Sequence, residues 1–311
     1  MVARRHHYVP QCYLKGFAVT RKRARQVQVF DRTSRRTFPA SIADVAVEKD
    51  FNTVDLEGHA PDVFEQGLSA FETELSERII ATESLDNEED RINLLNLIAA
   101  VAIRHPAKRE IYRDFQERLA RGLMSTMTSS REIWDSHIRK ATAAGYISPD
   151  ADTSYERMRD FVRDGNYRID VPNEMYMKIE MTGLDAILPY LVARGWILVR
   201  ASPDSGGFVT SDQPVCLIWS DPNRGPIGYG LKDTEVIFPL TNRLAVMGAF
   251  DIENEATTAP DNYVAEINGL IIAYSRRQVY ARDMNFSYTS RQGEPPRKAS
   301  RLMTDRNFLR S

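Results

Sequence analysis

The alternation of apolar and polar residues changes its period twice along the chain. Residues 26–30 (Gln-Val-Gln-Val-Phe) alternate in the manner of a half-buried β-strand, and turn residues at 31–34 lead to a return strand that begins at 36, which predicts a hairpin. From residue 61 to about 194, apolar residues recur at helical spacing in four or five segments. After residue 196 short apolar runs return. The chain is therefore organised as strands, then helices, then strands.

The C-terminal third contains five short apolar runs typical of strands, then a helix and a last strand. The predicted strands cover 196–200, 208–210, 215–219, 236–240, 244–250 and 278–281, and the predicted helix covers 261–274. Helices grouped between two blocks of strands are typical of an α+β fold. We therefore predict a mixed or antiparallel sheet, built from the N-terminal hairpin and the C-terminal strands, with a central helical insertion packed on it.

The domain organisation follows from the composition between these blocks. No stretch rich in Pro, Gly and Ser separates the strands from the helices, which favours a single α+β domain over residues 1–290. Its helical lobe would cover about 61–194. Residues 291–311 are rich in Arg, Gly, Pro and Ser, and we expect them to form a loosely ordered tail.

The helical segments carry start and stop signals of their own. Asp86 can cap a helix whose third position after the cap is Glu89, and Pro106 interrupts that helix. The next helix is predicted to run over 107–144, with a break at Gly122. The apolar face of the capped helix is made of small or branched residues, which predicts a central core helix. These residues are Ile92, Leu95, Ala99, Ala102 and Ile103.

Composition and charge narrow the class of protein only coarsely. The 311 residues include 42% hydrophobic and 27% charged residues, which is ordinary for a globular protein. A formal net charge of −2 gives no global field that would attract nucleic acid or an anionic membrane. No segment reaches the roughly 18 uninterrupted apolar residues of a membrane span, and the start of the chain lacks the apolar run of a signal peptide. We therefore expect a cytoplasmic protein without a membrane partner.

The two cysteines are far apart in the sequence. Cys12 and Cys216 form no CxxC pair, so we expect two buried, free thiols in a reducing compartment. A catalytic cysteine is the alternative, and it has no local support in the residues around either position.

His6 and His7 are the first candidates for chemistry, because they place two of the five histidines side by side. Neighbouring side chains of an extended segment point to opposite faces, so only one of the two can face a given site. That histidine would be a general base or a single ligand to a metal ion. The alternative is one histidine packed in the core and one that faces solvent.

Three further polar residues lie near the ends of predicted elements. Asp212, after Ser211 at the end of a strand, is either a turn residue that binds backbone amides or a group that projects into a cleft. Arg104, at the end of a core helix, either interacts with the helix terminus or is a buried charge that needs a carboxylate partner. Asn268, among apolar residues of a helix, needs a buried loop or a ligand to satisfy its amide.

The sequence motifs of several large enzyme classes are missing from the chain. HExxH, GxGxxG, the Walker loop, GxSxG and paired CxxC motifs do not occur, which weighs against a zincin, a dinucleotide enzyme, a P-loop NTPase and an α/β-hydrolase. A dispersed site, assembled from the N-terminus, a core helix and the sheet, stays open.

Several segments of the chain together form a recognisable pattern. They are His6-His7-Tyr8-Val9-Pro10-Gln11, Tyr13-Leu14-Lys15-Gly16-Phe17, Asp50-Phe51-Asn52-Thr53, Glu74, Arg104-His105-Pro106, Thr210-Ser211-Asp212-Gln213-Pro214-Val215, Phe238-Pro239-Leu240-Thr241 and Asn268. This pattern resembles the bacterial family catalogued as domain of unknown function 4238, over about residues 4–282. The resemblance implies that His6, His7, Arg104, Asp212 and Asn268 belong together, and such a polar set is more typical of a site than of a core.

Two positions depart from the pattern of this family. Asn52 stands where many members have an aromatic residue, and His105 stands where members tend to have Thr. Neither position is therefore assigned a role on the basis of the resemblance.

Our first functional hypothesis is a nuclease-like hydrolase of phosphodiesters. His6 or His7 would be the general base or a metal ligand, and Arg104 would stabilise the charge that develops on the phosphate. Asp212 would be a metal ligand or acid/base partner. The substrate would be contacted by Asn268, Gln11 and Ser211. A divalent metal ion is the candidate cofactor, with His7 and Asp212 as its candidate ligands.

The rival hypothesis is a non-catalytic protein. It would bind nucleic acid or a small anionic ligand as a regulatory or defence component, and the same motif residues would form its ligand pocket. In a third interpretation these residues form a buried polar network that fixes the N-terminus onto the sheet. The substrate, the metal and the oligomeric state do not follow from the sequence.

Overall fold

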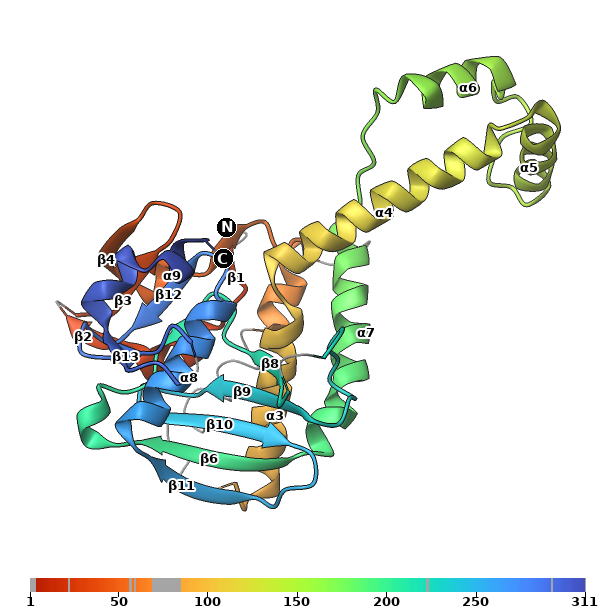
Figure 1. Cartoon of the computed structure of the whole chain (residues 1–311). Helices are drawn as coiled ribbons and strands as arrows, with labels where there is room; N and C mark the ends of the chain where they lie inside the picture. Colours follow the sequence, from red (N-terminus) through yellow and green to blue (C-terminus); the bar gives the residue numbers. More distant parts are fainter. Residues whose placement is uncertain are drawn as a thin grey trace. The chain divides into compact units, whose positions relative to one another are not determined.

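The computed structural model in Figure 1 describes residues 4–21, 23–55, 58, 60–68, 85–221, 224–291 and 293–310. The chain divides into two compact units, of which the first comprises residues 1–106 and 177–311 and the second comprises residues 107–176. The second unit is shorter than the expected helical lobe, because the helix before it and most of the helix after it belong to the first unit. Glu74 and most of the first expected helix lie outside the described residues.

The α+β prediction is confirmed, and the larger part of the C-terminal strands forms a sheet of its own. The strand order is β11-β6-β10-β9-β8, and all pairs are antiparallel except β11 with β6. The strands are β6 (Gly195–Ala201), β8 (Cys216–Trp219), β9 (Thr234–Pro239), β10 (Leu244–Ala249) and β11 (Glu255–Ala259). β11 was not predicted, because its side chains are mostly exposed and show no apolar alternation.

A second five-stranded sheet joins the two ends of the chain. The predicted hairpin consists of β3 (Ala24–Asp31) and β4 (Arg36–Ser41), and β3 pairs antiparallel with β12 (Gln278–Ala281). β2 (Val19–Arg21) and β7 (Thr210–Ser211) complete the sheet. The hairpin therefore does pair with a C-terminal strand, as expected, but the C-terminal strands are shared between two sheets.

The expected strand at 208–210 is reduced to the two residues of β7. The backbone N–H of Phe208 donates to the carbonyl of Asn242 (2.8 Å), and the N–H of Val209 donates to the side chain of Asn268 (2.9 Å). These amides are therefore bonded to loops and a side chain, so no neighbouring strand can pair with them.

Short elements fix the N-terminal segment within the first unit. β1 (Arg5–His7) pairs antiparallel with β5 (Val47–Lys49), and α1 (Gln11–Leu14) continues into the 3-10 turn η1 (Lys15–Phe17). Another 3-10 turn, η2 (Ile42–Asp44), precedes β5. Gly16 is required by packing, because a Cβ atom there would lie 2.9 Å from the carbonyl oxygen of Leu240.

Helices of the first unit cover both faces of the sheet β11-β6-β10-β9-β8. α8 (Asp261–Tyr274) begins and ends where the sequence predicts, and its Tyr263 reaches Met247 of β10. On the opposite face the indole of Trp196 donates to the carbonyl of Leu191 in α7 (Asn173–Val192) (3.0 Å). The alternation of side chains along β6 and β10 places these contacts on different faces.

α3 (Glu88–Ile103) is the predicted core helix, with a different cap. Asn87 is the N-cap, and its side chain accepts from the N–H of Asp90 (3.0 Å), so the helix begins after Asn87 rather than Asp86. Leu95, Ala99 and Ala102 are buried as expected, whereas Ile92 is exposed.

The second unit contains α4 (Pro106–Met127), α5 (Arg131–Ala143) and α6 (Tyr155–Asp164). The expected break at Gly122 does not occur, and α4 ends five residues after it. Thr128 donates to the carbonyl of Met124 (2.8 Å), and Ser130 caps α5 by accepting from the N–H of Ile133 (3.3 Å). One glycine costs a helix only about 1 kcal/mol, so the Thr-Ser-Ser run decides the boundary.

The C-terminal tail differs from the expected loose segment. It forms β14 (Arg297–Lys298), which pairs with β13 (Ser287–Tyr288), followed by the 3-10 helix η4 (Ala299–Thr304) and α9 (Arg306–Arg310). Leu302 and Phe308 are buried, so these apolar residues anchor a polar segment.

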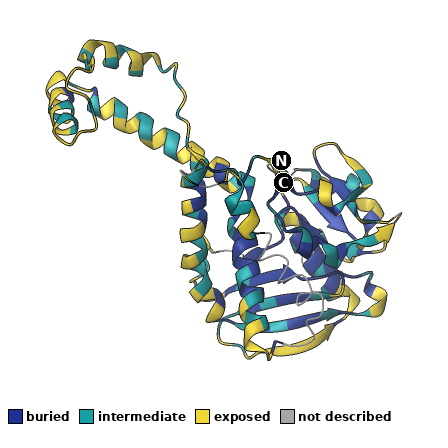
Figure 2. Ribbon diagram, turned by 180° about the vertical axis from the view of Figure 1, so that it is seen from behind, coloured by how far each residue is buried: buried dark blue, intermediate teal, exposed yellow. Residues whose placement is uncertain are grey.

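Buried residues gather in the first unit. Figure 2 shows dark blue on both sheets and on the helices beside them, whereas α4, α5 and α6 are mostly yellow and teal. None of the described helices combines the length and the apolar character needed to cross a membrane.

Candidate functional site

His6 is fully buried and fixed by a backbone amide. The Nδ1 atom of His6 accepts from the N–H of Asn52 (2.7 Å), and the side-chain amide of Asn52 donates to a carboxylate oxygen of Glu65 (2.5 Å). Because Nδ1 is an acceptor, a neutral His6 ring carries its proton on Nε2. β1 and the turn at Asn52 together set the orientation of this ring.

His7 contacts a different set of groups. Its ring hydrogen-bonds the backbone of Val45, and no hydrogen-bond partner of its buried Nδ1 atom is found among the described residues. Burial, with a smaller contribution from the charge of Arg5, lowers the pKa of His7 to about 4. His7 is therefore a neutral imidazole near pH 7. The two histidines point to different groups, as the alternation along an extended segment predicts.

Arg104 and His105 bring the end of α3 against this segment. Arg104 is buried, and its guanidinium donates to the carbonyl of His7 over a long 3.4 Å. The ring of His105 lies edge-on to Tyr8, with 5.3 Å between the ring centroids. We call His6, His7, Asn52 and Arg104 the N-terminal cluster.

Tyr8 connects the N-terminal cluster to Asp212, a role that the sequence did not reveal. Its hydroxyl hydrogen-bonds Tyr280 of β12, and burial, together with the nearby charge of Asp212, raises the pKa of Tyr8. The two predicted site regions are thus neighbours that share a tyrosine. An aromatic residue next to two histidines was the only signal in the sequence for this connection.

Asp212 holds the turn between α8 and β12. One carboxylate oxygen accepts from the N–H of Arg276 (2.9 Å), and the other accepts from the N–H groups of Arg277 (2.7 Å) and Gln278 (3.0 Å). Burial raises the pKa of Asp212, although these N–H donors oppose the shift. Asp212 therefore does bind backbone amides, but those of a segment more than sixty residues later in the chain.

The end of α8 is completed by a residue from the N-terminal hairpin. The guanidinium of Arg32 donates to the carbonyls of Arg276 (3.2 Å) and Ile272 (3.4 Å), and it lies 4.6 Å above the ring of Phe308. A cation at these carbonyls stabilises the C-terminus of a helix. Asp212 and Arg32 therefore fix the same turn from two directions.

Asn268 is fully buried in α8 and satisfied by three backbone groups. Its amide oxygen accepts from the N–H of Val209 (2.9 Å), and its amide nitrogen donates to the carbonyls of Gly207 (3.0 Å) and Ser287 (2.8 Å). The side chain thus ties the loop before β7 and the strand β13 to the helix. Of the two alternatives left open for Asn268, this geometry corresponds to the buried loop.

Other motif residues join the same network. The hydroxyl of Tyr13 donates to the carbonyl of Pro239 (2.7 Å) and shares a hydrogen bond with Thr210 (2.7 Å). Ser211 is buried, and its hydroxyl accepts from the N–H of Gln213 (3.1 Å), whereas Gln11 is partly exposed at the start of α1. Cys12 and Cys216 are buried free thiols, as predicted, and burial raises the pKa of Cys216.

The candidate metal ligands do not fit a metal site well. Both carboxylate oxygens of Asp212 accept backbone N–H groups, which leaves them poorly placed to bind a cation. Across the described part of the chain, no group of three or more His, Cys, Asp or Glu side chains is arranged to hold a metal ion.

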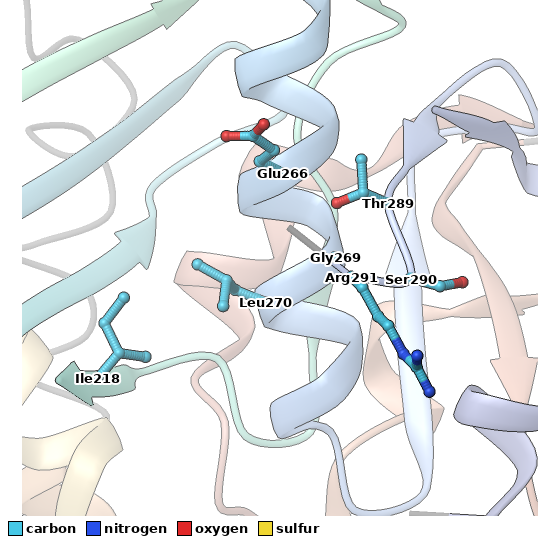
Figure 3. Close-up of a pocket in the computed structure, with 7 residues that line it drawn as sticks. All are labelled: Ile218, Glu266, Gly269, Leu270, Thr289, Ser290 and Arg291. Atoms are coloured by element: carbon cyan, nitrogen blue, oxygen red, sulfur yellow. The ribbon is translucent and has the colours of Figure 1, made fainter. Parts of the chain in front are cut away.

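The predicted site residues do not line any of three pockets that described residues form on the first unit. Figure 3 shows a pocket of about 160 Å³ over α8, with Ile218 and Leu270 on one side and Arg291 on the other. A larger groove of about 580 Å³ follows η4. It is lined by Pro296, Arg297, Lys298, Ser300, Arg301, Thr304 and Asp305.

Comparison with known proteins groups the chain with one family. Residues 5–285 match the family model described as Protein of unknown function (DUF4238). The chain belongs to this family. No curated protein and no solved structure matches the chain. In this DUF4238 protein, the described motifs that carry the resemblance lie where the N-terminal segment, α3, α8 and the two sheets come together.

Proposed function

We propose that the protein binds nucleic acid without catalysis, and that it contacts the phosphate backbone through a basic C-terminal surface. Residues 276–310 contain nine Lys or Arg and three Asp or Glu, a net charge of +6, whereas the whole chain carries −2. Such a local excess of positive charge attracts polyanions even when the net charge is slightly negative. This charge asymmetry is the observation that carries the proposal, and it is visible in the sequence.

Part of this positive charge lines the groove along η4. Arg297, Lys298 and Arg301 line it, and all three are exposed. Arg297 is partly committed to Asp305 (2.9 Å), whereas the Lys298 ammonium lies 3.3 Å from the hydroxyl of Ser287. Lysine, arginine and hydroxyl groups are the usual partners of phosphate oxygens.

The predicted site residues support binding more than catalysis. Asp212 and Asn268 direct their polar atoms to backbone groups of the protein, so these atoms are committed to holding the fold. The motif residues then act as a polar network beneath the binding surface. We place the protein in the cytoplasm as part of this proposal, since both cysteines are free thiols.

Fluorescence anisotropy with labelled single-stranded RNA and double-stranded DNA tests the proposal. We expect the variant Lys298→Glu/Arg301→Glu to bind at least tenfold more weakly and to show a shallower dependence of affinity on salt concentration. The control, Arg139→Glu/Lys140→Glu, makes the same change of charge on exposed residues of α5. Equal loss in both variants, or no binding by the wild type, contradicts the proposal. If inorganic phosphate binds and the polymers do not, the ligand is a small anion.

A phosphodiester hydrolase is the second candidate, and the N-terminal cluster favours it. Neutral His7 has a buried Nδ1 atom that can accept a proton, and the Arg104 guanidinium approaches its backbone. In this mechanism His7 is the general base and Arg104 stabilises the charge on the phosphate.

Incubation with labelled RNA and DNA, with and without Mg²⁺ or Mn²⁺, tests the hydrolase. Cleavage by the wild type that is lost in a folded His7→Ala variant supports it. Equal cleavage by both proteins, or none by either, removes it. A requirement for Mg²⁺ or Mn²⁺ would identify the divalent ion.

A further inference from the structure

An exposed apolar stripe runs along α4. Ile111, Phe115, Leu119 and Leu123 are spaced four residues apart, and their exposed fractions are 64%, 52%, 46% and 56%. Residues four apart lie on the same side of a helix, so the four side chains form one continuous ridge. A ridge of large apolar side chains on a charged helix marks an interaction surface.

The second unit as a whole has little core of its own. The only buried residues described in it are Arg109, Thr128, Trp134 and Tyr176. Of the fifteen exposed large hydrophobic residues in the described part of the chain, eight lie in it, although it contains fewer than a quarter of the residues. These eight are Ile111, Phe115, Leu119, Leu123, Ile133, Tyr146, Phe161 and Met175.

We propose that α4 pairs antiparallel with α4 of a second copy of this chain. The ridge is symmetric about residue 117, which lies at the middle of the helix, so antiparallel pairing places Phe115 against the partner's Leu119. The same operation places Ile111 against the partner's Leu123. A surface that is complementary to itself under a two-fold rotation is what a symmetric dimer requires.

The charges beside the ridge fit the same pairing. Asp114 and Arg118 flank the ridge on one side, three positions before and one position after its centre. A two-fold axis brings Asp114 within two helical positions of the partner's Arg118, and the reciprocal pair forms by symmetry. Both side chains are exposed, and their present contacts lie within the same helix: the Asp114 carboxylate is 3.4 Å from the guanidinium of Arg113, and Nε of Arg118 donates to the carbonyl of Asp114 (3.2 Å).

The geometry of helix packing sets the crossing angle. A ridge of residues four apart is inclined to the helix axis, and two such ridges lie along each other when the helices cross at about 50°. α4 is about 33 Å long at 1.5 Å per residue, which accommodates all four pairs of side chains.

Sedimentation equilibrium of the full chain between about 1 and 100 μM tests the dimer. We expect Phe115→Lys to raise the dissociation constant at least tenfold. Tyr146→Lys, on an exposed residue of the same unit, is the control and should leave the constant unchanged. A chain that is monomeric over this range, or a dimer that Phe115→Lys leaves intact, overturns the proposal.

Two mixing experiments test the register. Phe115→Cys and Leu119→Cys chains, mixed and oxidised mildly, should form a disulfide heterodimer in excess over either homodimer. The native cysteines are buried and should not compete in this reaction. Asp114→Arg and Arg118→Asp chains should associate with each other more tightly than either does with itself. Random cross-linking, or no preference for the mixed pair, contradicts the antiparallel register.

Discussion

The two units of this protein bury apolar side chains to very different degrees. In the first unit, two sheets and the helices beside them share one hydrophobic core, and polar motif residues inside it are bonded to backbone groups. In the second unit, three amphipathic helices leave six large apolar side chains exposed, and Trp134 is their only large apolar side chain that is buried. Substitutions of the same type should therefore have different consequences in the two units.

The largest difference is expected for leucine truncation. Leu198→Ala, in the core of the first unit, should lower the free energy of unfolding by about 3–5 kcal/mol, because it leaves a cavity. Leu119→Ala, on the exposed ridge of α4, should change it by less than about 0.5 kcal/mol in a sample dilute enough to be monomeric. Urea unfolding measures both, and equal losses would show that the second unit has a core of its own.

The next largest effect is expected at Asp212. Asp212→Asn removes one acceptor oxygen and leaves buried N–H groups of the turn at 276–278 without a partner, which should cost about 3 kcal/mol. Asp204→Asn, on an exposed residue of the same unit, is the matched control. A small effect at Asp212 would mean that its contacts do not stabilise the fold and would free it for a functional role.

His7 should make the first unit sensitive to acid. Its pKa is 6.5 when unfolded and about 4 in the folded protein, so only the unfolded chain takes up a proton between these values. The free energy of unfolding should be highest above pH 6.5 and should fall by about 3 kcal/mol as the pH drops to 4. His7→Gln should remove this part of the pH dependence in urea unfolding, with His137→Gln on α5 as the control. An unchanged pH profile for His7→Gln would contradict the assignment.

The smallest effect on stability is expected for two tryptophans whose indole N–H groups each donate to a backbone carbonyl. The indole of Trp134 donates to the carbonyl of Thr153 (2.7 Å) in the second unit, and that of Trp219 donates to the carbonyl of Gly225 (2.9 Å) in the first. Trp134→Phe should weaken the contact between α5 and the segment before α6 by about 1 kcal/mol. Hydrogen exchange should then accelerate only in the second unit, whereas Trp219→Phe should leave that unit unchanged. Acceleration throughout the chain would show that the two units unfold together.

Local patterns in the sequence were enough to predict most regular elements. α8 and β12 have the predicted bounds, because their apolar residues repeat with the period of a buried face. β11 and the short strand β5 were missed, since five residues or fewer with mostly polar side chains give no period. The break predicted at Gly122 was wrong. The hydrogen bonds of Thr128 and Ser130 determine where the helix ends, and a single weak helix former such as Gly122 does not.

The candidate site was harder to predict, because its partners are distant in the sequence. Asn268 was a candidate because a buried amide needs partners, whereas Asp212 was predicted either to hold a turn or to project into a cleft. Their partners are backbone groups of Val209, Gly207 and Ser287 in one case and of residues 276–278 in the other. Almost every residue has the same backbone N–H and C=O groups, so the sequence does not identify which of them a side chain binds. The roles of these side chains therefore followed only from the fold.

The pairing of β3 with β12 also has a consequence for synthesis of the chain. The two strands are about 250 residues apart, so the hairpin leaves the ribosome long before its partner strand exists. During that interval β3 presents unpaired backbone groups at residues 28–31, and an unpaired edge invites contact with other chains. Chains that end before residue 278 should therefore aggregate, whereas chains that include β12 close this edge themselves.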